Sequence, residues 1–158
     1  MTLCDLKSAR LSAASWEEIS EYELTQLFAD AVVRWLPPGF QSAKTDTERR
    51  HFLWQLSGEA EIIALTDVDG VHIGIVILAH GDPERHLGYL FAQQAWGRGY
   101  ATELLRALQD LYATQPVCLI GGVMAQNAAS SRALEKTGFE RASDGADWTY
   151  RWQSPAQS

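Results

Sequence analysis

The spacing of hydrophobic positions predicts two helices in the first part of the chain. The apolar side of the first helix consists of Leu24, Leu27, Phe28, Ala31 and Trp35. A capping-box pattern, S-E-Y-E at 20–23, precedes it, and the Pro-Pro-Gly run at 37–39 ends it. A second box, T-D-T-E at 45–48, predicts a helix that ends near Gly58, and a short strand is expected earlier, around residues 5–12.

Strand-like patterns follow these helices. Residues 61–79, EIIALTDVDGVHIGIVILA, predict two strands that are joined by a tight turn at Asp69-Gly70. A further strand is expected at 86–92, HLGYLFA. The segment 116–124, PVCLIGGVM, is continuously apolar, which is typical of a strand buried on both faces. The alternation in residues 139–152 predicts a final hairpin.

Two more helices complete the pattern. An apolar stripe over residues 101–112 predicts a helix directly after the sequence WGRGY, and residues 127–137 predict a short helix that ends at Gly138. The order strand, glycine turn, helix, strand predicts one parallel crossover in an otherwise antiparallel sheet. We therefore expect an α/β domain of the α+β type, with a mixed, mostly antiparallel sheet flanked by helices. It should span residues 1–153 as one domain, with a disordered tail at 154–158.

Composition narrows the class of protein. The chain has 158 residues, 46% of them hydrophobic, and a net charge of −7, so it lacks the basic surface that nucleic-acid binding requires. Acidic balance is weakly compatible with a cationic substrate. The two cysteines, Cys4 and Cys118, form no disulfide or metal pattern, and the chain contains neither a signal-peptide pattern nor a membrane-spanning run. We expect a cytoplasmic protein without a bound metal.

The Gly-Arg-Gly turn at 97–99 stands between a predicted strand and a predicted helix. The N–H groups in the first turn of such a helix favour a phosphate, and glycine lets the phosphate approach the backbone. A dinucleotide fingerprint would need a third glycine where Thr102 stands, and no P-loop sequence occurs. A turn that only lets the helix pack closely on its strand is the structural alternative.

Two motifs together give a more specific interpretation. YLFAQQAWGRGYATELL, followed by NAASSRALEKTGF, resembles the GNAT N-acetyltransferases, and most closely their RimJ/RimL-type branch. The resemblance extends from about His86 to Phe139. It implies a splayed sheet and acetyl-CoA as co-substrate, with the pantetheine arm between the strands at 86–92 and 116–124.

The resemblance also implies which residues hold the co-substrate. In the family pattern [QR]xxGx[GA], Trp96 would replace the usual Gln or Arg, although a literal match begins at Gln94, too early for the helix stripe. The implied pyrophosphate loop consists of Trp96, Gly97, Arg98, Gly99, Tyr100, Ala101 and Thr102. A strand bulge in the family would place the backbone amides of Leu90, Phe91 and Ala92 at the thioester carbonyl. Asn127 would contact the cofactor, although asparagine is also a good helix N-cap.

Acetyl transfer to an amine needs a base and a group that stabilises the leaving thiolate, and it needs no serine or cysteine nucleophile. By resemblance, Ser130 lies near the thioester sulfur and is the candidate general acid that protonates it, or it only orients that sulfur. His86 stands where related chains often carry glutamate, so it is a candidate base or a strand-edge histidine, with Glu84 as its substitute. Trp148, Tyr150 and Trp152 are expected in the core or the acceptor-pocket wall, and residues 37–46 are expected to border that pocket.

The sequence therefore predicts transfer of an acetyl group from acetyl-CoA to a primary amine by direct attack in a ternary complex. The acceptor would be a small molecule or a protein N-terminus. The expected partners are this acceptor and a second copy of the chain in a homodimer, but neither nucleic acid nor membrane. One alternative is a CoA-binding regulatory or partner-binding module without turnover. The other alternative, a nicotinamide-dependent oxidoreductase, holds only if the glycine turn is considered without the second motif.

Overall fold

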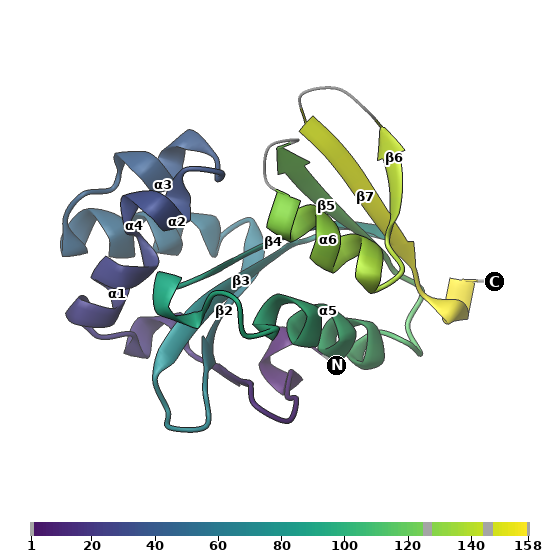
Figure 1. Ribbon diagram of the computed structural model, residues 1–158, viewed down its shortest axis with the longest axis horizontal. Helices are drawn as coiled ribbons and strands as arrows, with labels where there is room; N and C mark the ends of the chain where they lie inside the picture. The colour runs from purple at the N-terminus through teal and green to yellow at the C-terminus, as the bar shows by residue number, and fades with distance from the viewer. Residues whose placement is uncertain (1, 125–127, 144–146, 158) are drawn as a thin grey trace.

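The protein is built on one seven-stranded sheet (Figure 1). The computed structural model describes residues 2–124, 128–143 and 147–157. Its strands are β1 (Ser12–Ala14), β2 (Ala60–Thr66), β3 (His72–Ala79), β4 (Glu84–Phe91), β5 (Cys118–Met124), β6 (Glu140–Ser143) and β7 (Asp147–Gln153). They lie in the order β1-β2-β3-β4-β5-β7-β6, and only the β4–β5 pair is parallel. The expected mixed, mostly antiparallel sheet with one parallel crossover is confirmed.

Helices cover both faces of the sheet (Figure 1). One face carries α1 (Glu21–Leu27), α2 (Asp30–Val33), α3 (Pro38–Ser42) and α4 (Asp46–Leu56). The other carries α5 (Tyr100–Leu111) and α6 (Ala128–Lys136). Short 3-10 turns are η1 (Leu3–Asp5), η2 (Trp16–Glu18), η3 (Gln93–Ala95) and η4 (Pro155–Gln157). Within the described ranges, no helix combines the length and the apolar character that crossing a membrane would take.

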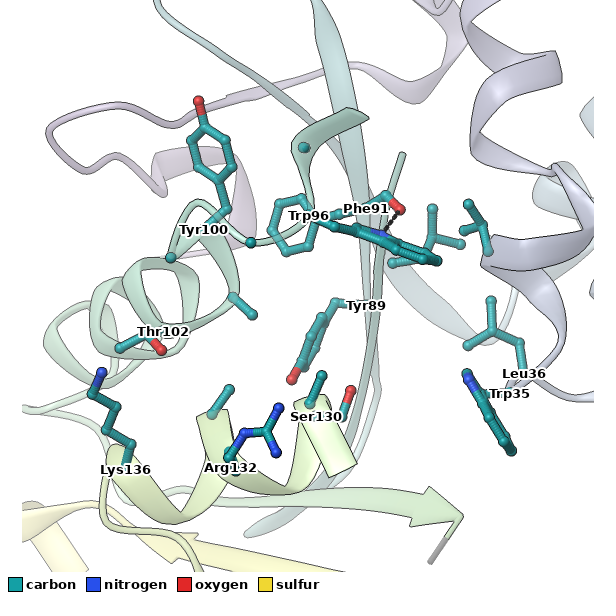
Figure 2. Close-up of a pocket in the computed structure, with 18 residues that line it drawn as sticks. Trp35, Leu36, Tyr89, Phe91, Trp96, Tyr100, Thr102, Ser130, Arg132 and Lys136 are labelled. Carbon is teal, nitrogen blue, oxygen red and sulfur yellow. Dashed lines mark hydrogen bonds between the residues drawn. The ribbon is translucent and has the colours of Figure 1, made fainter. Parts of the chain in front are cut away.

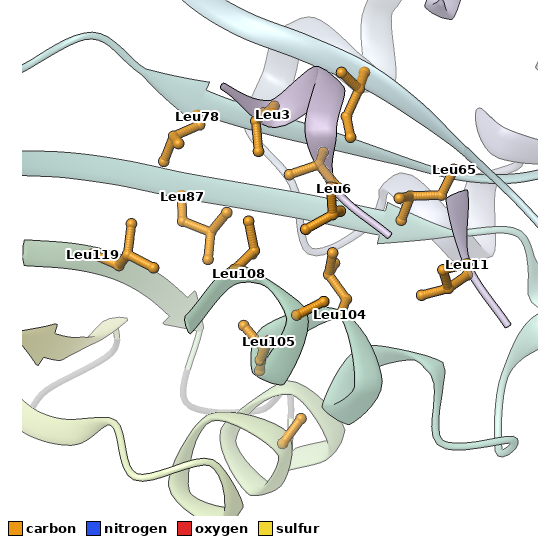
Figure 3. Close-up of a cluster of buried hydrophobic side chains, with 14 of the residues drawn as sticks. Leu3, Leu6, Leu11, Leu65, Leu78, Leu87, Leu104, Leu105, Leu108 and Leu119 are labelled. Atoms are coloured by element: carbon orange, nitrogen blue, oxygen red, sulfur yellow. The ribbon is translucent and has the colours of Figure 1, made fainter. Parts of the chain in front are cut away.

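Two hydrophobic cores follow from this layering. The larger core packs α5 against the sheet through Leu104, Leu105 and Leu108, all fully buried, with the segment around η1 closing one side (Figure 3). The second core joins α1–α4 to the opposite face of β2, β3 and β4. Alternate residues of a strand point to opposite faces, so Leu87 belongs to the first core and Leu90 to the second.

The first helical region differs from its prediction. The Ser20–Glu23 capping box forms as expected, but α1 ends at Leu27 and α2 begins at Asp30. Ala29 between them has an extended backbone, with ψ of 147°, so one continuous helix to Trp35 does not form. Pro38 does not stop a helix but begins α3, since proline at the first helical position sacrifices no intrahelical hydrogen bond.

The two chain ends also depart from expectation. The predicted strand at 5–12 is replaced by η1 and the shorter β1, which pairs with β2. Ser154, which was expected in a disordered tail, is buried. Its hydroxyl donates to Gln115 O at 2.6 Å and accepts from Val117 N at 3.1 Å. These hydrogen bonds fix the chain beyond β7 against the start of β5.

The parallel pair at the centre of the sheet is short. β4 pairs with β5 only from Glu84–Leu87 to Cys118–Gly121. Beyond these pairs β4 stays with β3 and β5 stays with β7, so the two strands diverge (Figure 1). We call this opening the seam. It lies beside the N-terminus of α5 and the start of α6.

Candidate functional site

A cavity of about 530 Å³ occupies the seam. Its walls come from β4, the turn before α5, the first residues of α5, one side of α6, and the end of α2 with the turn that follows (Figure 2). The lining residues are Val32, Trp35, Leu36, Tyr89, Leu90, Phe91, Ala95, Trp96, Gly97, Gly99, Tyr100, Ala101, Thr102, Ala129, Ser130, Arg132, Ala133 and Lys136. Separate parts of the chain, from α2 to α6, therefore meet in one site.

The glycine turn opens the N-terminus of α5 into this cavity. Gly97 and Gly99 have φ of +75° and +80°, the left-handed region that glycine adopts without strain. Gly99 is the N-cap of α5, and its carbonyl accepts the first helical hydrogen bond, from Glu103 N at 3.0 Å. The N–H groups of the first turn, before Glu103, have no partner within the helix. A twelve-residue helix therefore directs free donors and its positive dipole end toward the cavity.

The N-terminal segment holds this first helical turn in place. The Glu103 carboxylate accepts from Arg10 Nε at 2.7 Å, from Arg10 N at 2.8 Å and from Ser8 Oγ at 2.5 Å. The Arg10 guanidinium also lies 4.3 Å from the Tyr100 ring centre. Burial acts to raise the pKa of Glu103, but these hydrogen bonds outweigh it and lower the pKa. The carboxylate therefore stays charged and fixes the orientation of α5.

Trp96 connects the turn to the end of β4. Its indole N–H donates to Phe91 O at 2.9 Å, while 47% of the side chain is exposed (Figure 2). The ring therefore forms part of the cavity wall and does not enter the core.

The backbone of β4 presents one amide of the expected set to the seam. Ala92 N donates to Ile73 O at 2.8 Å, so it is not available for a ligand. Antiparallel ladders alternate between residues bonded to the neighbouring strand and residues that face away. The backbone N–H of Leu90 therefore points to β3, and the backbone N–H of Phe91 points to the seam. The expected bulge is absent, because the β3–β4 register runs without a shift from Leu78–Leu87 to Gly74–Phe91.

Tyr89 and Ser130 face each other across the middle of the cavity (Figure 2). The Tyr89 hydroxyl is buried, and among the described residues no hydrogen bond of regular geometry reaches it. Burial raises the pKa of Tyr89 to about 12, and the nearby Ser130 hydroxyl opposes this shift. Tyr89 therefore keeps its proton throughout the physiological range and can donate a hydrogen bond to a ligand in the seam.

The two ends of the cavity differ in polarity (Figure 2). Thr102, Arg132 and Lys136 lie at one end, together with the N-terminus of α5. Trp35 and Leu36 lie at the other end. Among the described lining residues, the charged side chains are those of Arg132 and Lys136, and Asp, Glu and His do not occur. One end therefore suits an anion and the other an apolar group.

A sequence model of the acetyltransferase (GNAT) domain matches residues 10–140, which is most of the chain. The chain belongs to the GNAT acetyltransferase family. Members of this family acetylate amines with acetyl-CoA. No curated protein sequence matches this GNAT protein.

Several solved acetyltransferase structures share the fold of this chain. An acetyltransferase from Agrobacterium tumefaciens is 24% identical, with a TM-score of 0.67 over 93% of this chain and 92% of that one. The ribosomal L7/L12 α-N-protein acetyltransferase RimL, solved with coenzyme A, is 17% identical, with a TM-score of 0.72 over 94% and 97%. Spermidine N-acetyltransferase from Vibrio cholerae, solved with CoA and spermine, is 14% identical, with a TM-score of 0.71 over 93% and 96%.

Most residues that the sequence pointed to lie together in this GNAT protein. The cavity lining includes Leu90, Phe91, Trp96, Gly97, Gly99, Tyr100, Ala101, Thr102 and Ser130. Arg98 is exposed and Ala92 is fully buried, and neither lines the cavity. Asn127 lies outside the described residues.

The candidate base is not in the cavity. His86 is exposed and lies in the paired part of β4, opposite Ile120, roughly 13 Å along the strand from Leu90. Its substitute, Glu84, forms an ion pair with Arg151. The structure therefore brings Ser130, but neither of these groups, to the seam.

Several lining residues were not expected from the sequence. Tyr89 stood inside the family motif without a role, and its alternation with Phe91 along β4 was the available signal. Trp35 was placed on the apolar side of a helix, yet it follows α2 and faces the cavity. Of the two places expected for Trp148, Tyr150 and Trp152, the core is confirmed, since Tyr150 is buried in the larger core and the two tryptophans pack against it. The segment 37–46, which directly follows Leu36, is not in the lining.

Proposed function

We propose that this protein transfers the acetyl group of acetyl-CoA to a primary amine by direct attack within a ternary complex. The observation that carries the proposal is the cavity that joins the N-terminus of α5 to the open seam. It offers an anion site and a row of hydrogen-bond donors in one continuous space, which an extended phosphate-bearing thioester requires.

The residues present fit acetyl-CoA. Its pyrophosphate would meet the backbone N–H groups from Gly97 to Thr102, where the two left-handed glycines place no side chain in its way. Arg132 and Lys136 add positive charge at the same end of the cavity. The co-substrate supplies an activated acetyl thioester, and the seam is the route along which its pantetheine arm would lie.

The donors in the seam would stabilise the charges that acetyl transfer creates. The Phe91 N–H faces the opening and would donate to the thioester oxygen as that atom gains charge. Tyr89 and Ser130 would donate to the leaving sulfur. A thiol has a pKa near ~8.5, well below that of Tyr89, so Tyr89 stabilises the thiolate through a hydrogen bond and keeps its own proton.

Direct attack agrees with the side chains in the cavity. Ser130 has no histidine beside it among the described lining residues, and Cys4 and Cys118 do not line the cavity. An enzyme-bound acetyl group therefore lacks an activated nucleophile to carry it. The amine nitrogen would attack the thioester carbonyl carbon, and the C–S bond would break as the carbonyl re-forms. The proton that the amine loses would pass through solvent, to water or to the released thiolate, so that the step balances.

We also place this chain in the RimJ/RimL-type branch. Trp96 stands where most of the family has Gln or Arg. Its hydrogen bond to Phe91 O gives this tryptophan a structural role in linking the turn to β4. RimL and the spermidine enzyme share the fold with this chain but act on different acceptors. The fold therefore does not identify the acceptor of this chain, and the shape and charge of its cavity must be used instead.

A second candidate function is a CoA-binding module without turnover. It is favoured by the lack of Asp, Glu and His among the described lining residues, which leaves the amine without an evident base. The deciding experiment measures release of free thiol from acetyl-CoA over a panel of amines and N-terminal peptides, with mass spectrometry of the product. Acetylated amine supports the enzyme. Tight CoA binding with no product from any acceptor supports the module.

A further inference from the structure

We infer that the acceptor is a primary amine with an apolar or aromatic body, and not a polyamine or another multiply charged base. This inference rests on the proposed acetyl transfer. It follows from the end of the cavity opposite the anion site, where the acceptor must enter to reach the seam (Figure 2).

The wall at this end is apolar. Val32, Trp35 and Leu36 approach from the end of α2 and the turn after it, and Leu90 and Trp96 face them from the seam. Trp35 and Leu36 are only partly buried, so their apolar surface is available to a ligand. Covering such a surface with an alkyl or aryl group removes apolar area from water on both partners, which favours binding.

The charges around this wall are unfavourable for a second ammonium group. The Arg34 guanidinium lies 4.6 Å from the Trp35 ring centre and covers that face of the ring. The carboxylate of Asp30 lies on the same helix, but it pairs with Lys44 at 3.5 Å and does not line the cavity. An additional positive charge would therefore lose its hydration, meet a nearby guanidinium and find no carboxylate among the described lining residues.

The same wall helps the reacting amine. Removal of water disfavours the charged form of an amine, so an apolar pocket lowers the pKa of a bound ammonium group. The neutral amine is the nucleophile, and this effect supplies it even though the described lining residues include no Asp, Glu or His. The apolar wall would thus take over part of the work of a base.

The test compares hexylamine with 1,6-diaminohexane, which have the same chain length and differ by one ammonium group. Thiol release with each amine gives kcat/KM at saturating acetyl-CoA. We expect hexylamine to be preferred by roughly tenfold or more, in the range that an unpaired charge in an apolar pocket produces. Equal use of the two amines, or preference for the diamine, would overturn the inference but leave the proposed transfer standing. No release with any amine would overturn the transfer itself, and the acceptor assignment with it.

Trp35→Glu tests the wall directly. A carboxylate at this position should reverse the preference toward the diamine, since it supplies the missing partner for the second charge. Trp54→Glu is the matched control, because Trp54 is 64% exposed on α4 and lies outside the lining. CoA affinity should stay unchanged in both variants, which confirms folding. If Trp35→Glu does not fold, Leu36→Glu makes the same test. An unchanged preference in a folded, CoA-binding wall variant contradicts the inference.

Discussion

The Tyr89 hydroxyl is buried and has no regular hydrogen-bond partner among the described residues. Ser130 is its neighbour, but the contact lacks regular hydrogen-bond geometry, and a poorly satisfied buried hydroxyl costs up to about 1–3 kcal/mol. Its position at the centre of the seam therefore suggests a use when ligand is bound. We assign that use to the leaving sulfur. Phenylalanine would keep the ring packing of Tyr89 and remove only the donor.

We therefore expect Tyr89→Phe to lower kcat roughly 10–100-fold while the KM for acetyl-CoA changes less than about threefold. Because burial raises the pKa of Tyr89 to about 12, the wild-type kcat should show no Tyr89 titration below pH 10. The control is Tyr112→Phe, since that hydroxyl is also buried without a regular partner, but outside the cavity. Equal kcat values in wild type and Tyr89→Phe would remove Tyr89 from the reaction.

The N-cap of α5 offers a second comparison between single residues. Gly99 and Gly70 both have φ of +80°, and Gly70 lies in the β2–β3 turn. Apart from its chain neighbours, Gly70 has no described atom within 4 Å of the point where a Cβ would stand. Alanine at either site should reduce the free energy of unfolding by about 1–2 kcal/mol, because a side chain disfavours the left-handed region.

Only Gly99→Ala should also weaken CoA binding, by roughly tenfold, because Gly99 lines the cavity at the proposed pyrophosphate site, whereas Gly70 does not. Isothermal titration calorimetry with CoA measures this difference. Similar CoA affinities for Gly99→Ala and Gly70→Ala would show that the turn does not cradle the pyrophosphate.

At the scale of elements, one carboxylate joins α1 to the sheet. Glu23 closes the capping box by accepting from Ser20 N at 3.0 Å, and it accepts from His72 N of β3 at 2.9 Å. Burial acts to raise the pKa of Glu23, but the hydrogen bonds from His72 and Ser20 outweigh it and lower the pKa to about 2. Because the folded-state pKa is lowered, the charged carboxylate stabilises the fold above pH ~4.5.

Glu23→Gln should therefore lower the free energy of unfolding at pH 7 by roughly 1–3 kcal/mol. The difference between variant and wild type should shrink as the pH falls from about 4.5 to about 2, where wild-type Glu23 becomes protonated. Urea denaturation at a series of pH values measures it. Glu48→Gln, in the more exposed box of α4, is the comparison and should have a smaller effect. A difference that stays constant with pH would show that the charge on Glu23 does not matter.

Local signals predicted most elements, because their causes lie within a few residues. The capping boxes at Ser20 and Thr45, the Asp69-Gly70 turn and the stripe of α5 all formed where the sequence placed them. The break before Asp30 was not predicted, because Ala29 has an extended backbone and no proline or glycine near it signals a break. That break sets where α2 begins, and Trp35, which follows α2, lines the cavity.

The sequence could predict only those site residues that belong to one local motif. The glycine turn and Ser130 are local to such motifs, and they line the cavity. The direction of each β4 amide depends on the register with β3, and a change of one residue reverses it. His86 fits the motif in sequence but lies in the part of β4 that pairs with β5. The sequence motif does not show where this pairing ends.

At the scale of the whole molecule, ligand and fold are linked. The anion site and the seam come from β4, the turn before α5, and the starts of α5 and α6, so CoA would contact elements far apart in the sequence. A ligand that binds only the folded state at 100 times its Kd adds about 2.7 kcal/mol to the free energy of unfolding.

CoA at that concentration should raise Tm by roughly 5–10 °C for a chain of this size. Differential scanning fluorimetry measures the shift, with NADH at equal concentration as control. Stabilisation by NADH and not by CoA would contradict the proposed co-substrate and would support a dinucleotide site instead.

The short pairing between β4 and β5 has a consequence for how the chain folds. The β2–β3 and β3–β4 pairs join through short hairpin turns, which close small loops, whereas the pairing of Glu84–Leu87 with Cys118–Gly121 must enclose the whole of α5. Its entropic cost is larger, and few backbone hydrogen bonds offset it. We expect the β2–β4 meander and the β5–β7 layer to form first and to dock later along this line. The place where the protein would bind its co-substrate is then also a part of its sheet that assembles after the hairpins.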